Sequence, residues 1–342
     1  MGYEVPIASH HSAQIINLNE ILTRCKPDFQ RIEQSMKSHF SSHLPFVNEV
    51  SGYILFSGGK RFRPLLTVYA ARICGRDDPG DNEVYDLSVV PEYLHAASLL
   101  HDDVVDEGIL RRGRPPAYKV WGNKAAVLVG DYLYARAIDL ASSFGNVKIA
   151  QAIAKTVALM AEGEVIQLLE AKTPSYKERS YMEVIDRKTA SLISVSCRIG
   201  ALLAGASQDN VERLAEFGRY LGRAFQIIDD VLDYTADVKE LGKGLGTDLA
   251  EGKVTLPLIV ALEKAAPKDK NRLKGILENK NADYRDLSWI LELLEQTGGI
   301  EYARAKALSF IGQAVERIQP FKQGPAKSLL EDLSWFVAYR KK

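Results

Sequence analysis

Apolar residues recur at helical spacing along most of this chain. Intervals of three and four residues between them place the apolar side chains on one face of a helix. The clearest segments are residues 85–106, 124–143, 147–171, 180–205, 208–236 and 254–265. The sequence has no alternation of strands with helices, no repeat of 20–50 residues and no low-complexity linker. We therefore predict an all-α fold in which residues 1–342 form a single domain.

The composition narrows the class of protein. A chain of 342 residues with 46% hydrophobic and 26% charged residues can bury a large core. A formal net charge of +0 provides no overall attraction to nucleic acid or to an anionic membrane. Cys25, Cys74 and Cys197 form no C-x-x-C pair, which argues against a zinc ribbon and a disulfide framework. Because we find neither a signal peptide nor a transmembrane segment, we expect a cytoplasmic location.

Two copies of the pattern Asp-Asp-x-x-Asp carry the main functional signal. They are Asp102-Asp103-Val104-Val105-Asp106 and Asp229-Asp230-Val231-Leu232-Asp233. On a helix, residues i, i+1 and i+4 lie on one side, so each copy gathers three carboxylates that repel one another. A hard divalent cation such as Mg²⁺ relieves this repulsion and bridges carboxylates to substrate phosphates. One copy alone could be a solvated helix end, but both follow apolar runs, and the pair predicts a magnesium site at a buried face.

Several side chains near the clusters could serve the same site. His95 and Ser98 lie two turns and one turn before Asp102, and Gln226 lies one turn before Asp229. Local cations are present despite the zero net charge: Lys60, Arg61 and Arg63 after two glycines, the pair Arg111 and Arg112, Lys188 beside Thr189, and Lys243 and Lys253. Each could be a solvated surface charge when taken alone. Together they fit a site for two diphosphates, one held through metal ions and one held directly by arginine and lysine.

Seven stretches of the chain resemble the trans-isoprenyl diphosphate synthase family. They are GGKRFRP (58–64), LLHDDVVDEGILRRGRP (99–115), GDYLYARA (130–137), AEGEVIQL (161–168), VIDRKTASL (184–192), FQIIDDVLDY (225–234) and GKGLGTDLAEGKVTLP (242–257). They follow the family's order and look most like its bacterial long-chain, octaprenyl-type branch. The first 45 and last 75 residues match only in their helical character.

The resemblance implies a bundle of antiparallel helices around a deep central cavity, and a homodimer. It implies that the six aspartates Asp102, Asp103, Asp106, Asp229, Asp230 and Asp233 hold three magnesium ions on an allylic diphosphate. Residues that would assist this diphosphate are Arg111, Lys188, Thr189, Gln226, Lys243 and Lys253. Residues that would hold isopentenyl diphosphate are Lys60, Arg63, His95 and Arg112.

The reaction implied by the resemblance joins isopentenyl diphosphate to an allylic diphosphate such as farnesyl diphosphate. In this family, bulky residues four or five positions before the first cluster stop chain growth, whereas Ala97 and Ser98 are small here. We predict that the product tail extends toward Leu133 and Tyr134 and that the product is long, roughly C30 to C50. The alternative is that Ala97 and Ser98 only allow close helix packing while another side chain caps the cavity.

Three other functions stay open on these grounds. A short-chain farnesyl or geranylgeranyl diphosphate synthase would share every motif. A class I terpene cyclase usually replaces the second aspartate cluster and lacks the Gly-Gly-Lys-Arg and Arg-Arg elements. A non-catalytic synthase subunit tends to have lost one cluster.

The C-terminal residues Tyr339-Arg340-Lys341-Lys342 could close over the active site or form a solvated basic end. Because chain termini are commonly exposed, we favour the solvated end.

Overall fold

All regular elements that the structure describes are helices, as expected from the periodicity. The computed structural model describes residues 18–78, 80–108, 110–111, 113–235, 249, 252–279 and 284–340. Within these ranges the only β-type pairing is an isolated bridge between Arg111 and Arg114. The prediction of an all-α fold is confirmed.

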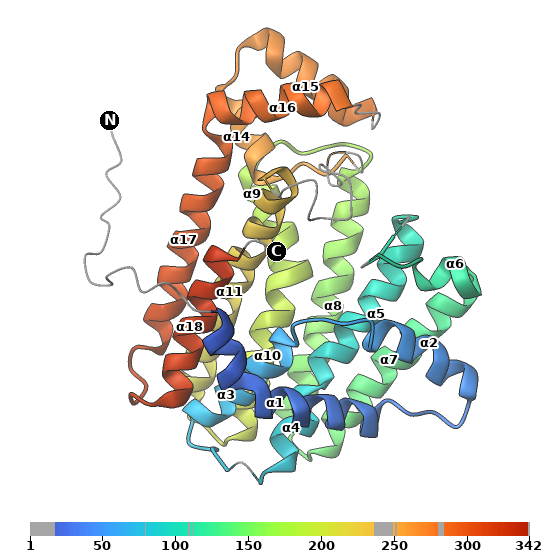
Figure 1. The fold of residues 1–342 in the computed structure, drawn as a ribbon, viewed down its shortest axis with the longest axis vertical. Coiled ribbons are helices and arrows are strands. Elements are labelled where there is room, and N and C mark those ends of the chain that lie inside the picture. The colour runs from blue at the N-terminus through green and yellow to red at the C-terminus, as the bar shows by residue number, and fades with distance from the viewer. Residues whose placement is uncertain are drawn as a thin grey trace.

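Figure 1 shows how the helices follow one another along the chain. The first eight are α1 (Leu18–His39), α2 (Pro45–Leu55), α3 (Phe62–Ile73), α4 (Asn82–Ser88), α5 (Val90–Val105), α6 (Ala117–Trp121), α7 (Asn123–Ser143) and α8 (Val147–Glu170). The middle of the chain forms α9 (Glu178–Ile185), the π-helical turn η1 (Asp186–Ala190), α10 (Ser191–Leu203) and α11 (Gln208–Thr235). The remaining helices are α14 (Leu256–Lys264), α15 (Pro267–Asn279), α16 (Tyr284–Thr297), α17 (Gly299–Ile318) and α18 (Pro325–Tyr339).

The predicted helices agree with the structure except at two breaks. The segment predicted as one helix over 85–106 is divided at Val89 into α4 and α5. Pro91 in the first turn of α5 explains this division, because proline cannot donate the backbone hydrogen bond that a continuous helix needs. The segment 180–205 contains the π-helical turn η1 between α9 and α10, which the apolar pattern did not reveal.

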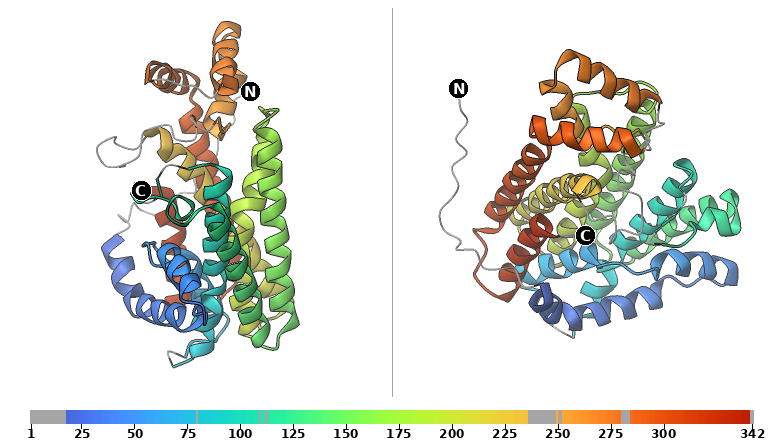
Figure 2. Two further views of the ribbon diagram at one scale, coloured as in Figure 1. Left: turned by 90° about the vertical axis from the view of Figure 1, so that its right-hand side faces the viewer. Right: turned by 45° about the horizontal axis from the view of Figure 1, so that its top comes forward.

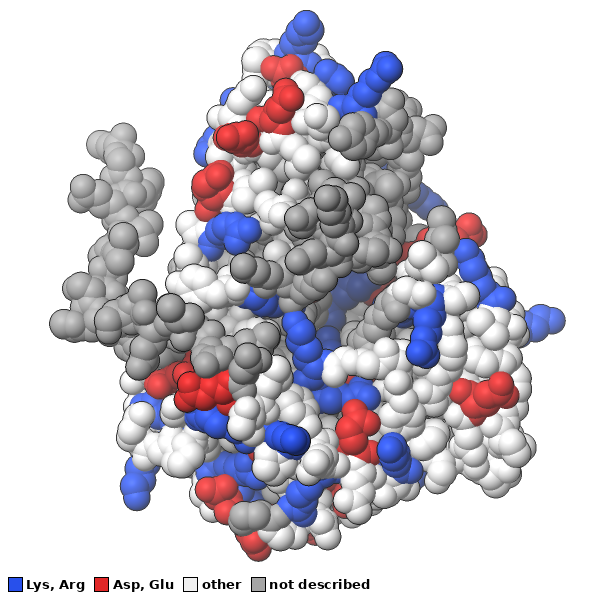
Figure 3. Space-filling view, viewed as in Figure 1, with Lys and Arg blue, Asp and Glu red and all other residues white. Residues whose placement is uncertain are grey.

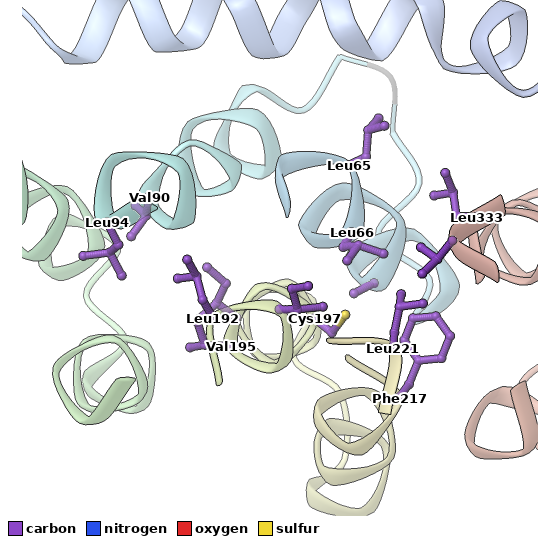
Figure 4. Close-up of a cluster of buried hydrophobic side chains, with 14 of the residues drawn as sticks. Leu65, Leu66, Val90, Leu94, Leu192, Val195, Cys197, Phe217, Leu221 and Leu333 are labelled. Carbon is purple, nitrogen blue, oxygen red and sulfur yellow. The ribbon is translucent and has the colours of Figure 1, made fainter. Parts of the chain in front are cut away.

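Helix α10 lies at the centre of the bundle, against α3, α8 and α11 (Figures 1 and 2). Two glycines allow the close approach. A Cβ atom at Gly200 would lie 2.2 Å from the carbonyl oxygen of Thr67 on α3, and one at Gly218 would lie 2.6 Å from that of Ile193 on α10. Buried side chains from these helices fill the space between them, with Leu66, Cys197 and Phe217 as examples (Figure 4).

A second, smaller core joins α14, α15 and α16 beyond the end of the main bundle (Figure 1). Its members include Leu258, Leu273 and Ile290, all fully buried. None of the helices in the described ranges has the length and apolar character needed to cross a membrane.

A buried carboxylate joins the N-terminal helix to the bundle. Asp28 of α1 accepts hydrogen bonds from the hydroxyls of Tyr69 (2.5 Å) and Tyr85 (2.6 Å) and two from the guanidinium of Arg72 (2.7 and 2.9 Å). Burial alone would raise the pKa of Asp28, but these donors outweigh it and lower the pKa below its ordinary value. This carboxylate is fully compensated by protein groups.

Candidate active site

The two aspartate clusters lie at the ends of α5 and α11, facing two adjoining pockets. One pocket, of about 520 Å³, is lined by Asp106, Asp230, Glu164 and Lys253 among others. The other, of about 550 Å³, is lined by Asp102, Asp229, His95, Lys60 and Arg63 among others. Lys188, Thr189 and Gln226 line both pockets and form their common wall. The structure therefore brings together clusters that are more than a hundred residues apart in sequence.

In the first cluster, positive charge comes from η1 and from the loop after α5. The Nζ atom of Lys188 lies 2.5 Å from Glu164 Oε1 and 3.7 Å from Asp102 Oδ2. Arg111 Nε donates to Asp103 Oδ1 at 2.6 Å. Burial raises the pKa of Asp102, and the neighbouring Glu164 and Asp106 raise it further although Lys188 opposes them. The cluster is thus short of positive charge.

In the second cluster, neutral donors fix the orientation of Asp230. The hydroxyl of Tyr181 donates to Asp230 Oδ2 at 2.6 Å, and Gln226 Nε2 donates to Oδ1 at 2.8 Å. The hydroxyl of Thr189 donates to Gln226 Oε1 at 2.7 Å. This chain of hydrogen bonds sets the amide of Gln226 with its nitrogen toward the carboxylate, and it links η1 directly to the aspartates of α11.

The prediction of a solvated C-terminal end is wrong for Arg340. Its Nη2 atom donates to Asp229 Oδ1 at 2.5 Å and to the carbonyl oxygen of Phe225 at 2.9 Å. Its guanidinium lies 3.8 Å from the centre of the Phe225 ring, and the residue is only 9% exposed. Tyr339, by contrast, is 64% exposed. Arg340, the residue that follows α18, thus lies in the pocket. This position is compatible with the alternative stated above, that the C-terminal residues close over the active site.

Asp229 remains short of positive charge despite this partner. Its side chain is 44% exposed, but the exposed surface faces the pocket rather than the outer surface of the protein. Burial among the pocket walls raises the pKa of Asp229, against the opposing effects of Arg340, Lys60 and Arg63.

The glycine-rich segment before α3 distributes its three basic side chains between the pocket and the core. Gly58, Gly59 and Arg61 all have positive φ angles, of 95°, 145° and 45°. Lys60 and Arg63 line the pocket with Asp229. Arg61 also lines this pocket, but its guanidinium is buried and donates to Glu33 and Glu92, at 2.6 and 3.1 Å. The space-filling view shows lysine and arginine side chains reaching into the central hollow of the molecule (Figure 3).

The other predicted site residues are placed as follows. His95 and Ser98 line the pocket of Asp229, and Lys253 lines the pocket of Asp230. Arg112 and Lys243 lie outside the described residues. Asp103, Arg111 and Asp233 are described but line neither pocket. The sequence reasoning did not single out Glu164, Tyr181 or Arg340 as site residues; Glu164 lies within the AEGEVIQL stretch, and no local pattern marks the other two.

The two residues proposed to control product length are in different surroundings. Ser98 lines the pocket, and its hydroxyl donates to the carbonyl oxygen of His95 at 2.9 Å. Ala97 is fully buried. Neither pocket is lined by Ala97, Leu133 or Tyr134. The role of this region in product length stays a prediction.

The carboxylates fit a magnesium site that is completed by substrate. Among the described residues, no three acidic, histidine or cysteine side chains converge closely enough to hold an ion by themselves. Magnesium usually keeps several waters and takes only one or two carboxylates together with substrate phosphates. The oxygen donors and the shortage of positive charge at Asp102 and Asp229 agree with that mode of binding.

The chain belongs to the polyprenyl synthetase family, whose sequence model matches residues 44–294. It is therefore a trans-prenyltransferase by class, as the motifs implied. It is 36% identical over 325 residues to the octaprenyl diphosphate synthase of Escherichia coli (strain K12), covering 95% of this chain and 99% of that protein. It is 38% identical over 326 residues to that of Haemophilus influenzae, covering 95% and 98%.

A solved structure supports the same assignment. The polyprenyl synthase of Caulobacter crescentus, complexed with calcium and isoprenyl diphosphate, superposes with a TM-score of 0.88 at 32% identity. The match covers 95% of this chain and 98% of that chain. The isoprenoid synthase type of fold that the resemblance implied is confirmed.

Proposed function

We propose that this prenyltransferase adds isopentenyl diphosphate units to farnesyl diphosphate and releases a long-chain, octaprenyl-type all-trans-polyprenyl diphosphate. The observation that carries this proposal is the pair of adjoining pockets with a common wall. One pocket is rich in carboxylates and suits a diphosphate bound through metal ions. The other adds Lys60, Arg63 and Arg340 and suits a diphosphate bound directly by cations.

In this proposal the allylic diphosphate binds at the two aspartate clusters beside the common wall, because Asp106 and Asp230 line one pocket and Asp102 and Asp229 line the other. Asp102, Asp103, Asp106, Asp229, Asp230 and Asp233 hold three Mg²⁺ ions with it. The ions supply Lewis acidity that stabilises negative charge developing on the leaving diphosphate. Lys188 stands between the clusters and carries part of the same task. Thr189 and Gln226 orient the second cluster, while Arg111, Lys253 and Lys243 complete the set.

Isopentenyl diphosphate binds in the second pocket. Lys60, Arg63 and His95 hold its diphosphate, together with Arg112 from the segment outside the described residues. Arg340 joins this set because its guanidinium lies in the same pocket as Lys60 and Arg63. Phe62 and Phe225 stack with ring centres 5.8 Å apart and give this pocket an apolar wall, which would limit the access of water to the reacting carbons.

The reaction in this proposal is the one that the resemblance to the family implies. The bond between the allylic carbon and its diphosphate breaks, the double bond of isopentenyl diphosphate attacks that carbon, and a proton is lost from the product. No side-chain nucleophile is needed. As the resemblance to the family implies, the departing diphosphate accepts the proton.

Product length is tested by incubating the purified chain with farnesyl and isopentenyl diphosphates and sizing the products by chromatography. We expect products between roughly C30 and C50, in line with the octaprenyl diphosphate synthases that the chain is similar to. Products no longer than C20 would contradict the proposal in favour of a short-chain synthase. Conversion of farnesyl diphosphate that does not depend on isopentenyl diphosphate would instead indicate a terpene cyclase.

A homodimer forms part of the proposal. Helices α7 and α8 expose large apolar side chains, among them Leu128 (67%), Val147 (67%) and Leu169 (61%). Apolar side chains of this kind on neighbouring helices suit association with a second copy. We expect the wild type to sediment as a dimer and the Leu128→Glu variant to sediment as a monomer.

Activity of the purified chain alone would exclude the role of a non-catalytic subunit.

A further inference from the structure

The common wall of the two pockets depends on an unusual backbone turn. Lys188 and Thr189 belong to η1, the π-helical turn between α9 and α10. Such turns are rare and are often found at functional sites, because an ordinary α-helical backbone would direct the side chains differently. The other side of the turn faces away from the pockets: Asp186 and Arg187 line a separate groove of about 1070 Å³ between α8, α9, α10 and α11.

An ion pair on that outer side joins η1 to α11. Asp186 Oδ1 accepts from Arg223 Nε at 2.5 Å, and Asp186 Oδ2 accepts from Arg223 Nη2 at 2.6 Å. Arg219, one turn earlier on α11, donates to Oδ2 at 3.0 Å. Burial would raise the pKa of Asp186, but the two arginines lower it below its ordinary value. Because the Arg223 contact has two hydrogen bonds, it fixes orientation as well as distance.

The arginine of this pair is itself held in place. The Arg223 guanidinium lies 5.3 Å from the ring centre of Phe310 on α17 and 5.6 Å from that of Tyr220 on α11. Those two rings stack on each other with centres 6.2 Å apart. Next to Arg223, a Cβ atom at Gly222 would lie 2.5 Å from the Cα atom of Ala190, so the backbones of α11 and η1 touch here. Three helical elements therefore determine where Asp186 is held.

We infer that Asp186 and Arg223 form a positioning clamp that sets Lys188 and Thr189 against Gln226 and the second aspartate cluster. Arg223 lies three residues before Gln226 on α11, and Asp186 lies two residues before Lys188. The clamp thus connects the two segments that build the common wall. Neither residue lines the proposed substrate pockets, so both act through the wall residues. This inference rests on the proposed function of the pockets.

The expected effect of breaking the clamp follows from the geometry of the wall. A displacement of about 1 Å in a reacting group costs up to about a hundredfold in rate. The hydrogen bond from Thr189 to Gln226 stays in place as a second link, so we expect a smaller loss. Asp186→Asn and Arg223→Gln should each lower kcat about tenfold, while KM for isopentenyl diphosphate changes less than about twofold.

A second ion pair provides a matched control. Arg198 of α10 and Glu212 of α11 also make a two-hydrogen-bond contact, at 2.8 and 2.6 Å, between the segment after η1 and α11. This pair lies farther along both helices from Lys188 and Gln226. Arg198→Gln and Glu212→Gln should leave kcat within about twofold of the wild type. Thermal unfolding of all four variants separates loss of positioning from loss of fold.

The double variant and a conservative variant sharpen the test. Because both partners act through one contact, kcat of the double variant Asp186→Asn/Arg223→Gln should equal that of either single variant rather than the product of the two losses. Arg223→Lys keeps the charge and should recover part of the rate. Equal kcat in the clamp and control variants, or losses of kcat that follow the unfolding temperature in both pairs, would overturn the inference.

A binding measurement keeps the clamp separate from the proposed reaction. Calorimetric titration with inorganic diphosphate and Mg²⁺ reports on the carboxylate pocket without turnover. We expect Asp186→Asn to weaken this binding about fivefold while Glu212→Gln does not. A wild type that binds but forms no product would contradict the proposed function, whereas equal binding by both variants would contradict the clamp.

Discussion

Two regions of this molecule change the pKa of their aspartates in opposite directions. At the seam between α1, α3 and α4, Asp28 accepts four hydrogen bonds from Tyr69, Tyr85 and Arg72, and its pKa is lowered. In the central cavity, Asp102 and Asp229 each have a single cationic neighbour within 4 Å among the described residues, and their pKa values are raised.

The difference separates carboxylates that are compensated by side chains of the protein from carboxylates that are available to bind a cation. A buried carboxylate that the fold uses for stability is supplied with donors until its ionised form is favoured. A buried carboxylate left with too little positive charge raises the free energy of the fold unless a cation binds. The pocket around Asp102 and Asp229 therefore favours bound cations. Magnesium ions that bind together with a diphosphate would supply this positive charge.

The largest expected effect comes from neutralising the cavity carboxylates. Asp102→Asn and Asp229→Asn should each lower kcat/KM at least about a thousandfold, because several kcal/mol of charge stabilisation would be lost. Without metal, Asp102→Asn should unfold at a temperature equal to or above that of the wild type, because Lys188 keeps Glu164 as its partner. Steady-state kinetics and thermal unfolding in EDTA check the two parts.

The exposed Asp209, which pairs with Arg213 on the same helix as Asp229, gives a control through Asp209→Asn. Its kinetics should match the wild type. If Asp102→Asn lost both stability in EDTA and activity, the two regions would not differ in how their aspartates affect stability.

The next effect concerns the seam. Asp28→Asn should lower the free energy of unfolding by about 3–5 kcal/mol, because Arg72 would lose its buried partner charge and keep only the exposed Asp77, at 3.2 Å. Near 25 °C, kcat of the folded variant should stay within about twofold of the wild type. Denaturant unfolding and kinetics on the same preparation measure this. Asp332→Asn, which removes the partner of the half-exposed Arg24, should cost less than about 1 kcal/mol.

The pH dependence of stability should have opposite signs in the two regions. The lowered pKa of Asp28 stabilises the fold above its unfolded value of about 3.9, and this contribution is lost as the pH falls through the folded pKa. The raised pKa of Asp102 works the other way, because the metal-free fold loses stability as the pH rises and that carboxyl ionises.

The stability difference between the wild type and Asp28→Asn should therefore be full at pH 7 and shrink below about pH 4. In EDTA, Asp102→Asn should gain stability over the wild type with rising pH. An Asp28→Asn difference that stays constant from about pH 7 down to about pH 2, or an Asp102→Asn difference that stays constant between about pH 4 and pH 8, would show that the group does not control the pH dependence.

The smallest expected effect belongs to Arg340. Arg340→Gln should lower kcat/KM for isopentenyl diphosphate about 10- to 30-fold, because one of several cations around that diphosphate is removed. The kcat/KM of Arg340→Lys should lie between those of Arg340→Gln and the wild type, because lysine keeps the positive charge but lacks the planar guanidinium that can form two hydrogen bonds. The control Arg304→Gln removes a cation outside both pockets. Unchanged kinetics would leave Arg340 as a structural partner of Asp229 alone.

Much of the site could be predicted from local patterns. The Asp-Asp-x-x-Asp spacing puts the carboxylates on one helix face wherever the helix lies, and the apolar residues before each copy predict that this face is buried. The pairing of Arg61 with Glu33 and Glu92 could not be predicted, because these partners lie on other helices, 28 and 31 residues away. Nor could the burial of Arg340, because its partner Asp229 is 111 residues away.

The sequence by itself thus determined that the chain is helical, that it carries two Asp-Asp-x-x-Asp clusters, and that it resembles the trans-isoprenyl diphosphate synthases. Helical periodicity and motif spacing act over a few residues, so they can be read without the fold. Only the tertiary structure decided that the two clusters meet across Lys188, Thr189 and Gln226. It also decided that Lys188 and Thr189 belong to a π-helical turn and that Arg340 lies in one of the pockets. Those features depend on contacts between distant segments, which form only when the bundle packs.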